Sequence, residues 1–333
     1  MSVIGIDLGI TRVSLVVLRD GDVAEEVARA TERADAAVLL DQLEAMVDGA
    51  RAADLEAVGL GLPRIVEFET GRVVASKPLP ASPVTNGALD LPLGDVPLRV
   101  LLGERLGVPV FVDNHGSVSA FAEAHDIDLE LVTDHLVMFT VSADVGGGLV
   151  LGGRIYRGTT GAGGELGETI IGLDLGGTVP APMRFPQTGS LQYVAAGHAL
   201  DRLATLAGHV KPESALGRLR AQGKPVLGPD VIAAAREGDQ SAARMIEIWG
   251  QRIGVAVANA ITTFDPEEVV IGGDAATAGD LLLEPARRVA RGYVRPGLGA
   301  RTTIRLARHG YRAGVLGAAL LARDELDRGM LPG

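Results

Sequence analysis

The sequence predicts a mixed α/β protein with two similar halves around a cleft, and three observations indicate this fold class. Strand patterns alternate with helical patterns along the 333 residues, as they do when helices cover the faces of sheets. A strand–glycine turn–strand element at residues 3–21 recurs in the same order at residues 136–153, which indicates a duplication. The 45 glycines and the 3% of aromatic residues suit many tight turns between strands and helices.

Hydrophobic period and turn residues predict the elements of the N-terminal half. In residues 34–53 apolar side chains recur at helical spacing, and residues 55–62 form a buried strand that ends at Pro63. The other expected elements are a strand at 21–27, a hairpin at 67–74, a loop at 79–97, a helix at 96–106, a strand at 109–113 and a helix at 117–124.

The C-terminal half contains one long helix and several shorter elements. In residues 239–261 the side chains of Met245, Trp249 and Ile253 share a face, and Asp239 or Ser241 can cap the helix. The remaining expected elements are a glycine-rich loop at 158–168, an irregular segment at 172–186, a strand at 269–271, a helix after the Gly-Gly turn at 272–273 and a helix at 312–327.

Charge and composition exclude several classes of protein. The net charge of −11 argues against a nucleic-acid surface, which needs clustered Lys and Arg. The absence of cysteine excludes a disulfide scaffold and thiolate metal sites. No apolar stretch reaches the ~18–20 residues that span a bilayer, and the first strand carries Asp7, unlike a signal peptide. We expect a soluble cytoplasmic protein without a membrane or nucleic-acid partner.

The first hairpin turn carries groups that suit a phosphate. Asp7 ends the first strand, and Gly9 and Thr11 follow in a turn whose backbone N–H groups can approach an anion. Asp7 can face a phosphate, directly or through a hydrated Mg²⁺, with Thr11 donating a hydrogen bond. The alternative is that Asp7 caps the turn and Thr11 satisfies a backbone group. The second hairpin turn and the Gly272-Gly273 turn favour the phosphate interpretation.

Seven segments of the chain follow one another in a recognisable order, at residues 6–12, 61–64, 112–123, 142–148, 163–168, 265–273 and 314–319. They are counterparts of patterns such as I-D-L-G-G-T-K, G-I-P-G, V-E-N-D-A-N-A, G-T-G-I-G-G-G, A-G-E-L-G-H and G-L-L-G-A-A. In these motifs and their order the chain resembles the ROK family of repressors and sugar kinases, which has the actin-like, hexokinase-type ATPase fold (ribonuclease H-like).

The resemblance implies an architecture and a set of binding residues. It implies a small lobe of residues 1–115 with 314–333, a large lobe of residues 116–313, and a homodimer. The cleft between the lobes is expected to hold Asn114, His115 and Glu165, and lobe closure would exclude water. The implied phosphate and nucleotide contacts are Asp7, Gly9, Thr11, Asp144, Gly146, Gly272 and Gly273.

Three departures from the family pattern fall where phosphoryl transfer takes place. The family's kinases have an Asp general base where this chain has His115, and an imidazole lacks the negative charge of a carboxylate. Ile10 replaces a glycine in the first turn and narrows the space for a phosphate oxygen. Asp144 replaces a glycine in the second turn, and its carboxylate repels phosphate unless a metal ion intervenes.

The sugar and zinc positions are also altered. Asn114 and Glu165 occupy positions that contact sugar hydroxyls in the family, and Glu168 replaces the family's sugar-binding and zinc-binding His. Pro78 stands where the family has a sugar-contacting Asn. The family's zinc element G-C-L-E falls on residues 189–192, with Ser190 in place of cysteine. We therefore predict no zinc or other metal site.

Glu165 and Glu168, three positions apart in a glycine-rich loop, could also suggest an acid–base pair for hydrolysis. Glutamates near glycine turns more commonly lie in solvent or cap a following segment.

Three functions are weighed. The first is a degenerate ROK protein that binds a sugar or similar polar small molecule without efficient phosphotransfer. The second is an active glucokinase-like kinase that uses ATP and Mg²⁺, with His115 as general base. The third is a ROK repressor, which the acidic charge disfavours, as does a first phosphate strand that begins at Val3 with no winged helix before it. We favour the first function.

Overall fold

The computed structural model describes residues 2–50, 54–74, 91–172, 186–210 and 212–329. The chain divides into two compact units, and each is described separately. The first unit comprises Met1–Asp134, Gly148–Gly164 and Tyr311–Gly333, and the second comprises His135–Gly147 and Glu165–Gly310. The lobes expected from the sequence, with bounds at 115 and 314, stay a prediction.

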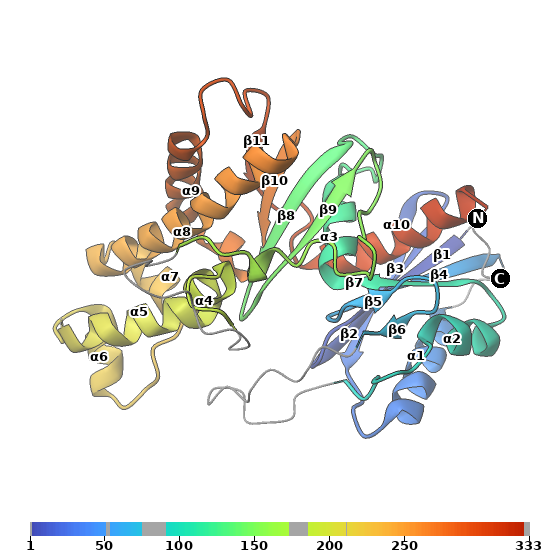
Figure 1. Cartoon of the computed structure of the whole chain (residues 1–333). Helices are drawn as coiled ribbons and strands as arrows, with labels where there is room; N and C mark the ends of the chain where they lie inside the picture. Colours follow the sequence, from blue (N-terminus) through green and yellow to red (C-terminus); the bar gives the residue numbers. More distant parts are fainter. Residues whose placement is uncertain (1, 51–53, 75–90, 173–185, 211, 330–333) are drawn as a thin grey trace. The chain divides into compact units, whose positions relative to one another are not determined.

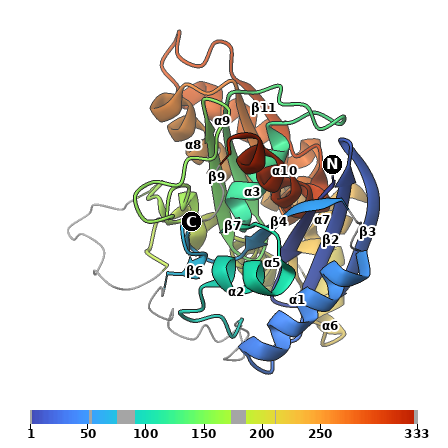
Figure 2. The same ribbon diagram turned by 90° about the vertical axis from the view of Figure 1, so that its right-hand side faces the viewer.

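The first unit is built on a five-stranded mixed sheet in the order β3-β2-β1-β4-β7. β1 (Ser2–Leu8), β2 (Arg12–Arg19) and β3 (Asp22–Ala30) form an antiparallel meander. On its other side β1 pairs in parallel with β4 (Leu55–Leu62), which pairs in parallel with β7 (Val110–Asn114). Figure 2 shows β2 and β3 running side by side. The N-terminal hairpin predicted from the sequence is confirmed.

In the part of the first unit that the structure describes, helices cover both faces of this sheet. α1 (Ala36–Ala50) and α2 (Leu98–Leu106) contribute Leu39 and Leu102 to a cluster that includes Ile4 and Ile6 of β1. Because side chains alternate along a strand, the residues between them face the other way. That second face packs against α10 (Ala313–Asp327), which in turn packs against α3 (His115–Glu123). A small hairpin of β5 (Val66–Glu67) and β6 (Arg72–Val73) completes the unit.

Glycine allows α10 to lie directly against the sheet and against α3. A Cβ atom on Gly59 of β4 would lie 1.8 Å from the carbonyl oxygen of Ala318, and one on Gly5 of β1 would lie 2.3 Å from that of Val315. A Cβ atom on Gly317 would lie 1.8 Å from the carbonyl oxygen of Val118 in α3. These distances are far below a van der Waals contact, so no other residue fits there without displacing the helix.

The parallel strands bring three chain segments to one edge of the sheet. Asp7 of β1 is level with Gly61 of β4, which is level with Asp113 of β7. Asn114 and His115 come directly after this row, at the junction of β7 and α3. Carboxyl ends of parallel strands are where ligands bind in α/β folds, so this edge is the candidate site of the first unit.

The second unit contains β8 (His135–Val141), β10 (Glu268–Gly272) and β11 (Thr303–Leu306), in a sheet of order β11-β10-β8-β9. β9 (Val145–Leu151) continues the chain from this unit into the first. β10 pairs in parallel with both β8 and β11. The order β9-β8-β10-β11 repeats the order β2-β1-β4-β7, which confirms the duplicated sheet.

The helices of the second unit pack mainly around α8 (Gln240–Phe264), as Figure 1 shows. Asp239 caps α8 by accepting hydrogen bonds from the backbone N–H groups of Ser241 and Ala242 at 2.9 and 3.0 Å. The other helices are α4 (Leu191–Ala195), α5 (Gly197–Val210), α6 (Ala215–Ala221), α7 (Gly228–Arg236) and α9 (Asp280–Tyr293). Short 3₁₀ helices are η1 (Leu166–Glu168), η2 (Asp274–Ala278) and η3 (Gly310–Arg312), the last at the junction of the units.

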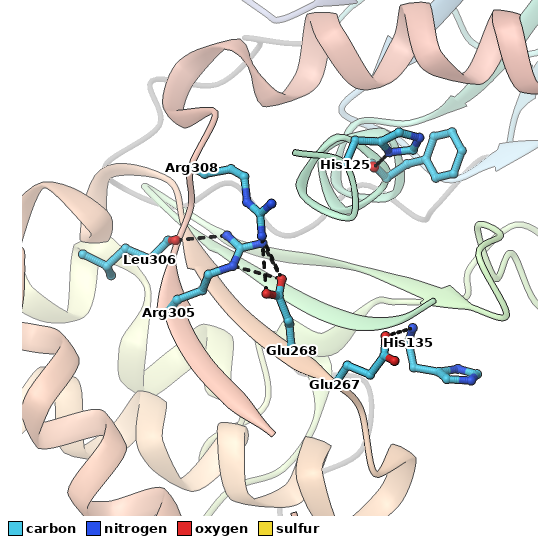
Figure 3. Close-up of polar contacts among 8 residues, drawn as sticks. His125, His135, Glu267, Glu268, Arg305, Leu306 and Arg308 are labelled. Carbon is cyan, nitrogen blue, oxygen red and sulfur yellow. Dashed lines mark hydrogen bonds and ion pairs between the residues drawn. The ribbon is translucent and has the colours of Figure 1, made fainter. Parts of the chain in front are cut away.

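Glu268 at the start of β10 fixes the neighbouring strand through two arginines (Figure 3). Nε and Nη2 of Arg305 donate to Glu268 Oε2 at 2.9 and 2.6 Å, and Nη2 of Arg308 lies 3.2 Å from the same oxygen. The carboxylate of Glu267 accepts from the backbone N–H of His135, at the start of β8, at 3.3 Å. These contacts hold β8, β10 and β11 in register, and therefore fix the turn that follows β10.

Most predicted elements are confirmed within two or three residues of their ends. The sequence predicted no elements in the region of α4 to α7 and did not predict β11. The irregular segment at 172–186 and the part of the predicted loop before residue 91 lie mostly outside the described residues. In the described part of the chain no helix is long and apolar enough to cross a membrane.

Replacing Gly59 by alanine should destabilise the first unit strongly. The new methyl group would overlap the Ala318 carbonyl, and overpacking of this kind costs typically ~1–3 kcal/mol or more. The matched control is Gly49→Ala, because Gly49 is an exposed residue of α1 with open space around it. Alanine there should stabilise the helix by roughly 0.5–1 kcal/mol. Thermal melting checks both; equal melting temperatures for the two variants would contradict the packing of α10.

Candidate functional site

In the first unit, Asp7 and His115 form a hydrogen-bonded pair at the carboxyl edge of the sheet. Asp7 lies near the end of β1 and His115 is the first residue of α3. Oδ1 of Asp7 lies 2.7 Å from Nδ1 of His115. α10 lies against the pair: a Cβ atom on Gly314 would be 2.6 Å from Oδ2 of Asp7 and 3.0 Å from Cε1 of His115. Glycine is therefore required at position 314 for this arrangement.

Two opposing effects act on the pKa of His115. Burial lowers the pKa of the imidazole, while the negative charge and the hydrogen bond of Asp7 raise it. The attraction prevails, and the pKa of His115 is raised above its ordinary value. The side chain is 40% exposed, so water screens much of the effect. A raised pKa makes the imidazole a cation over a wider pH range, which is the opposite of a carboxylate base.

Asn114 is engaged by the fold at both ends of its amide. Its Oδ1 accepts from the backbone N–H groups of Gly116 and Ser117 at 2.7 and 3.3 Å, and so caps α3. Its Nδ2 donates to the carbonyl oxygen of Arg64, in the segment that follows β4, at 2.9 Å. Asn114 thus links the start of α3 to the end of β4, and its predicted contact with a sugar hydroxyl stays a prediction.

A buried ion-pair network lies next to Asn114. Nε of Arg157 donates to Oδ2 of Asp113 at 2.7 Å, and its Nη2 donates to Oε1 of Glu325 at 3.0 Å. The guanidinium carbon lies 3.6 Å from the centre of the Phe68 ring. Burial raises the pKa of Asp113, and Arg157 offsets only part of this. Because Asp113 also accepts from the backbone N–H of Asn114 at 2.7 Å, Arg157 positions the strand that carries Asn114 and His115.

The first hairpin turn uses its own backbone groups. The N–H of Gly9 donates to the carbonyl oxygen of Arg12 at 2.9 Å. The carbonyl oxygen of Gly9 accepts from the hydroxyl of Thr31 at 2.8 Å, and the carbonyl of Thr11 accepts from the N–H of Thr31 at 3.2 Å. Thr11 itself is exposed. The Gly9 N–H is therefore already engaged inside the turn.

In the second unit, the turn between β8 and β9 is held from three sides. The N–H of Ser142 donates to the carbonyl of Asp144 at 2.9 Å, and the carbonyl of Ser142 accepts from the N–H of Gly197 at 2.7 Å. The amide of Gln192 reaches the turn from α4: its Nε2 donates to Oδ1 of Asp144 at 2.8 Å, and its Oε1 accepts from the N–H of Val145 at 2.6 Å. Asp144 is exposed, so its carboxylate faces whatever enters the turn.

The turn that follows β10 also contacts Ser142. The N–H of Asp274 donates to the hydroxyl of Ser142 at 3.1 Å. Gly273 has φ of +73°, and a Cβ atom on it would lie 2.7 Å from the carbonyl of Val141 and 2.8 Å from the Ser142 hydroxyl. Gly272 is level with Thr140 of β8. A Cβ atom on Gly146 of β9 would lie 2.7 Å from the Thr140 hydroxyl.

Burial and a neighbouring carboxylate raise the pKa of both Glu165 and Glu168. The pKa of Glu165 is raised by burial and then by the charge of Glu168. The pKa of Glu168 is raised by burial and then by the charge of Asp144. Both glutamates lie exposed at the surface, so water screens these shifts. Three carboxylates in electrostatic contact make this part of the second unit acidic.

The structure thus groups the predicted residues within each unit. In the first unit it brings together Asp7, Asn114 and His115; in the second, Asp144, Glu165 and Glu168 influence one another, and the turns of Ser142 and Gly273 meet. Pro78 lies outside the described residues. The contacts that sequence reasoning missed are those of Arg157, Gln192 and Ser142. The sequence did contain a sign that Gln192 matters, because this residue replaces the glutamate of the family's G-C-L-E pattern.

No group of three or more Asp, Glu, His or Cys residues that could hold a metal ion occurs among the described residues. The prediction of no zinc site stays a prediction.

Outside the candidate site, Nδ1 of His125 lies 2.7 Å from the carbonyl oxygen of Phe121 in α3 (Figure 3).

Comparison with known proteins identifies the family. The sequence profile of the ROK family matches residues 3–325. This chain belongs to the ROK family. It is 29% identical to the glucokinase of Halalkalibacterium halodurans, over 97% of this chain and 95% of that protein. It is also 29% identical to the xylose repressor of Caldicellulosiruptor bescii, over 86% of this chain and 69% of that protein.

A solved structure shows the same fold. The ROK glucokinase of Streptomyces griseus, in complex with glucose and AMPPNP, matches with a TM-score of 0.75 and 26% identity. The match covers 97% of this chain and all of that chain. The chain therefore has the actin-like ATPase fold of ROK sugar kinases and repressors, as the sequence predicts.

Several groups of the two turns that could meet a nucleoside triphosphate are already engaged within the protein. In the first unit, Asp7 is paired with His115 and the N–H of Gly9 is engaged within its turn. In the second unit, the N–H of Val145 is bound by Gln192, and the carboxylate of Asp144 stands in the turn. Phosphate binds through free backbone N–H groups and positive charge, so the engaged N–H groups of Gly9 and Val145 and the carboxylate of Asp144 do not favour it.

Replacing His115 by asparagine should remove a pH-dependent part of the stability. Because Asp7 raises the pKa of His115 above the unfolded value of about 6.5, the contribution of the pair is fully present below that pH. It is lost as the pH rises through the raised pKa. The difference in melting temperature from the unmodified chain should be largest near pH ~6 and shrink toward pH ~9, with a maximum of about 2–4 °C. A difference independent of pH would contradict the pairing.

Replacing Arg157 by alanine should destabilise the first unit by ~3–5 kcal/mol, because Asp113 and Glu325 would be left buried without their cation. The control is Arg154→Ala, an exposed residue three positions earlier whose loss should cost within about 0.5 kcal/mol. Denaturant unfolding followed by circular dichroism measures both. Equal midpoints for the two variants would show that the network contributes nothing.

Proposed function

We propose that this ROK-family protein binds a sugar or a similar uncharged polyol and does not transfer phosphate to it efficiently. The observation that carries this proposal is the hydrogen-bonded pair of Asp7 and His115. The pair engages the carboxylate of the first phosphate turn and places an imidazole of raised pKa at the family's general-base position. General acid–base catalysis contributes about 10²–10⁴-fold to the rate, so replacing the family's carboxylate base should slow phosphoryl transfer strongly.

The sugar-binding part of the proposal is supported by residue types and by relatives. Asn114 and Glu165 keep side chains that hydrogen-bond hydroxyl groups, and Glu168 adds an acceptor. The similarity to the Halalkalibacterium halodurans glucokinase covers 97% of this chain and 95% of that protein, and the matching Streptomyces griseus structure contains glucose. We also propose that the protein acts as a sugar sensor in the cytoplasm and that it forms a homodimer, as the resemblance to the family implies.

One observation favours the second candidate, an active sugar kinase that uses His115 as base. Asp7 binds Nδ1 of the ring, and among the described residues no hydrogen-bond partner faces Nε2. A carboxylate that orients an imidazole in this way is how many enzymes build a general base. The raised pKa and the closed second turn count against it.

A coupled kinase assay with a panel of hexoses and amino sugars, run beside a thermal-shift assay, separates the two candidates. We expect turnover at the level of the blank, together with a rise in melting temperature for at least one sugar. A sugar at ten times its Kd stabilises by ~1.4 kcal/mol, which is a few degrees. Turnover that His115→Ala abolishes would favour the kinase.

Two variants sharpen the assay. His115→Asp restores the family's carboxylate, and it should keep the sugar-induced shift in melting temperature. His198→Ala removes an imidazole of the second unit, 3.6 Å from Asp201, and serves as the control for loss of a histidine. If neither the unmodified chain nor His115→Asp shows any sugar-induced shift, the proposed function is wrong.

A further inference from the structure

The second turn contains a hydrogen-bonded pair of side chains, Asp144 and Gln192. The amide of Gln192 spans the turn, with Nε2 donating to the carboxylate of Asp144 at 2.8 Å and Oε1 accepting from the N–H of Val145 at 2.6 Å. Gln192 is held in place because it lies at the start of α4, whose N-terminus Ser190 caps with its hydroxyl, 3.2 Å from the N–H of Tyr193.

This arrangement removes donors that a phosphate would need. An anion binds in a turn of this kind through backbone N–H groups. The N–H of Val145 is bound by Gln192, and the N–H of Ser142 is bound by the carbonyl of Asp144. An arriving phosphate would therefore meet an occupied N–H group and a negatively charged side chain.

The two residues fit each other chemically. Asp144 stands where the ROK pattern has glycine, and Gln192 stands where it has glutamate. A glutamate at position 192 could accept from the N–H of Val145 but could not donate to the carboxylate of Asp144, and the two charges would repel. The amide of Gln192 both accepts from the N–H of Val145 and donates to Asp144. Glutamine at position 192 therefore accommodates the carboxylate at position 144.

We infer that Asp144 and Gln192 act together as a specificity-determining pair that excludes polyphosphate from this turn and leaves it selective for uncharged or cationic ligands. The inference rests on the proposed function and deepens it by naming the class of ligand that the second unit rejects. The acidic surroundings act in the same direction, because Asp144 is in electrostatic contact with Glu168, and Glu168 with Glu165.

Calorimetry with four chains tests the pair: the unmodified protein, Asp144→Gly, Gln192→Ala and the double variant. The probes are AMPPNP with Mg²⁺, sodium tripolyphosphate, and adenosine as the uncharged control. Gln192→Ala frees the N–H of Val145 but leaves the carboxylate unpaired, and should gain little. Asp144→Gly removes the charge but leaves the N–H occupied. The double variant should bind AMPPNP and tripolyphosphate at least tenfold more tightly than the unmodified chain, with adenosine unchanged.

Gln251→Ala is the matched control, because Gln251 is a glutamine of α8 whose Nε2 lies 3.4 Å from Glu247. It should leave the binding of all three probes unchanged. Melting temperatures within a few degrees of the unmodified chain establish that each variant is folded. A folded double variant with no gain, or an unmodified chain that already binds AMPPNP as tightly as the double variant, overturns the inference.

These outcomes can be told apart from failure of the proposed function. Tight AMPPNP binding by the unmodified chain without sugar phosphorylation refutes the pair but leaves the proposed function intact. Sugar phosphorylation by the unmodified chain refutes both. A gain of nucleotide affinity in the double variant, with no turnover in the unmodified chain, supports both.

Discussion

The hydrogen bond between Asp7 and His115 is the interaction on which the functional edge of the first unit depends. It joins the end of β1 to the first residue of α3, and α10 passes close by because position 314 is glycine. Any side chain at 314 would press on both partners. The identity of the residue at the base position is therefore tied to the packing of a helix from the far end of the sequence, and cannot be judged alone.

Arg157 helps to fix the position of the same edge from the interior of the unit. It reaches Asp113 on β7 and Glu325 on α10, and Asp113 in turn receives the backbone N–H of Asn114. Two buried carboxylates and one guanidinium thus fix the strand end from which the candidate ligand contacts project. Such networks contribute less to stability than their number of contacts indicates, since desolvation opposes them. Their effect is positional, because the geometry of one partner constrains the others.

The sequence allowed the fold to be predicted better than the site. Strand period, glycine turns and their duplication are local patterns, and they led to β1, β2, β4 and α8 with nearly correct ends. The pairs that decide the chemistry are not local: Asp7 and His115 are 108 positions apart, and Asp144 and Gln192 are 48 apart. No period or spacing connects them, and only the folded chain brings them together. The helices α4 to α7 were not predicted; three of them have nine residues or fewer, and apolar patterns that short are weak signals.

Two of the positions that depart from the family pattern have hydrogen-bonded partners. Random loss of a catalytic carboxylate would leave its neighbours with unsatisfied polar atoms, which are costly when buried. Among the described residues the buried side-chain atoms without a hydrogen-bond partner are Arg99 Nε, Arg312 Nε and Glu325 Oε2, and none belongs to the two turns or to the base position. Instead His115 is matched by Asp7, and Asp144 by Gln192. These two substitutions have partners of complementary chemistry, which agrees with our proposal that the site is organised around a ligand other than a polyphosphate.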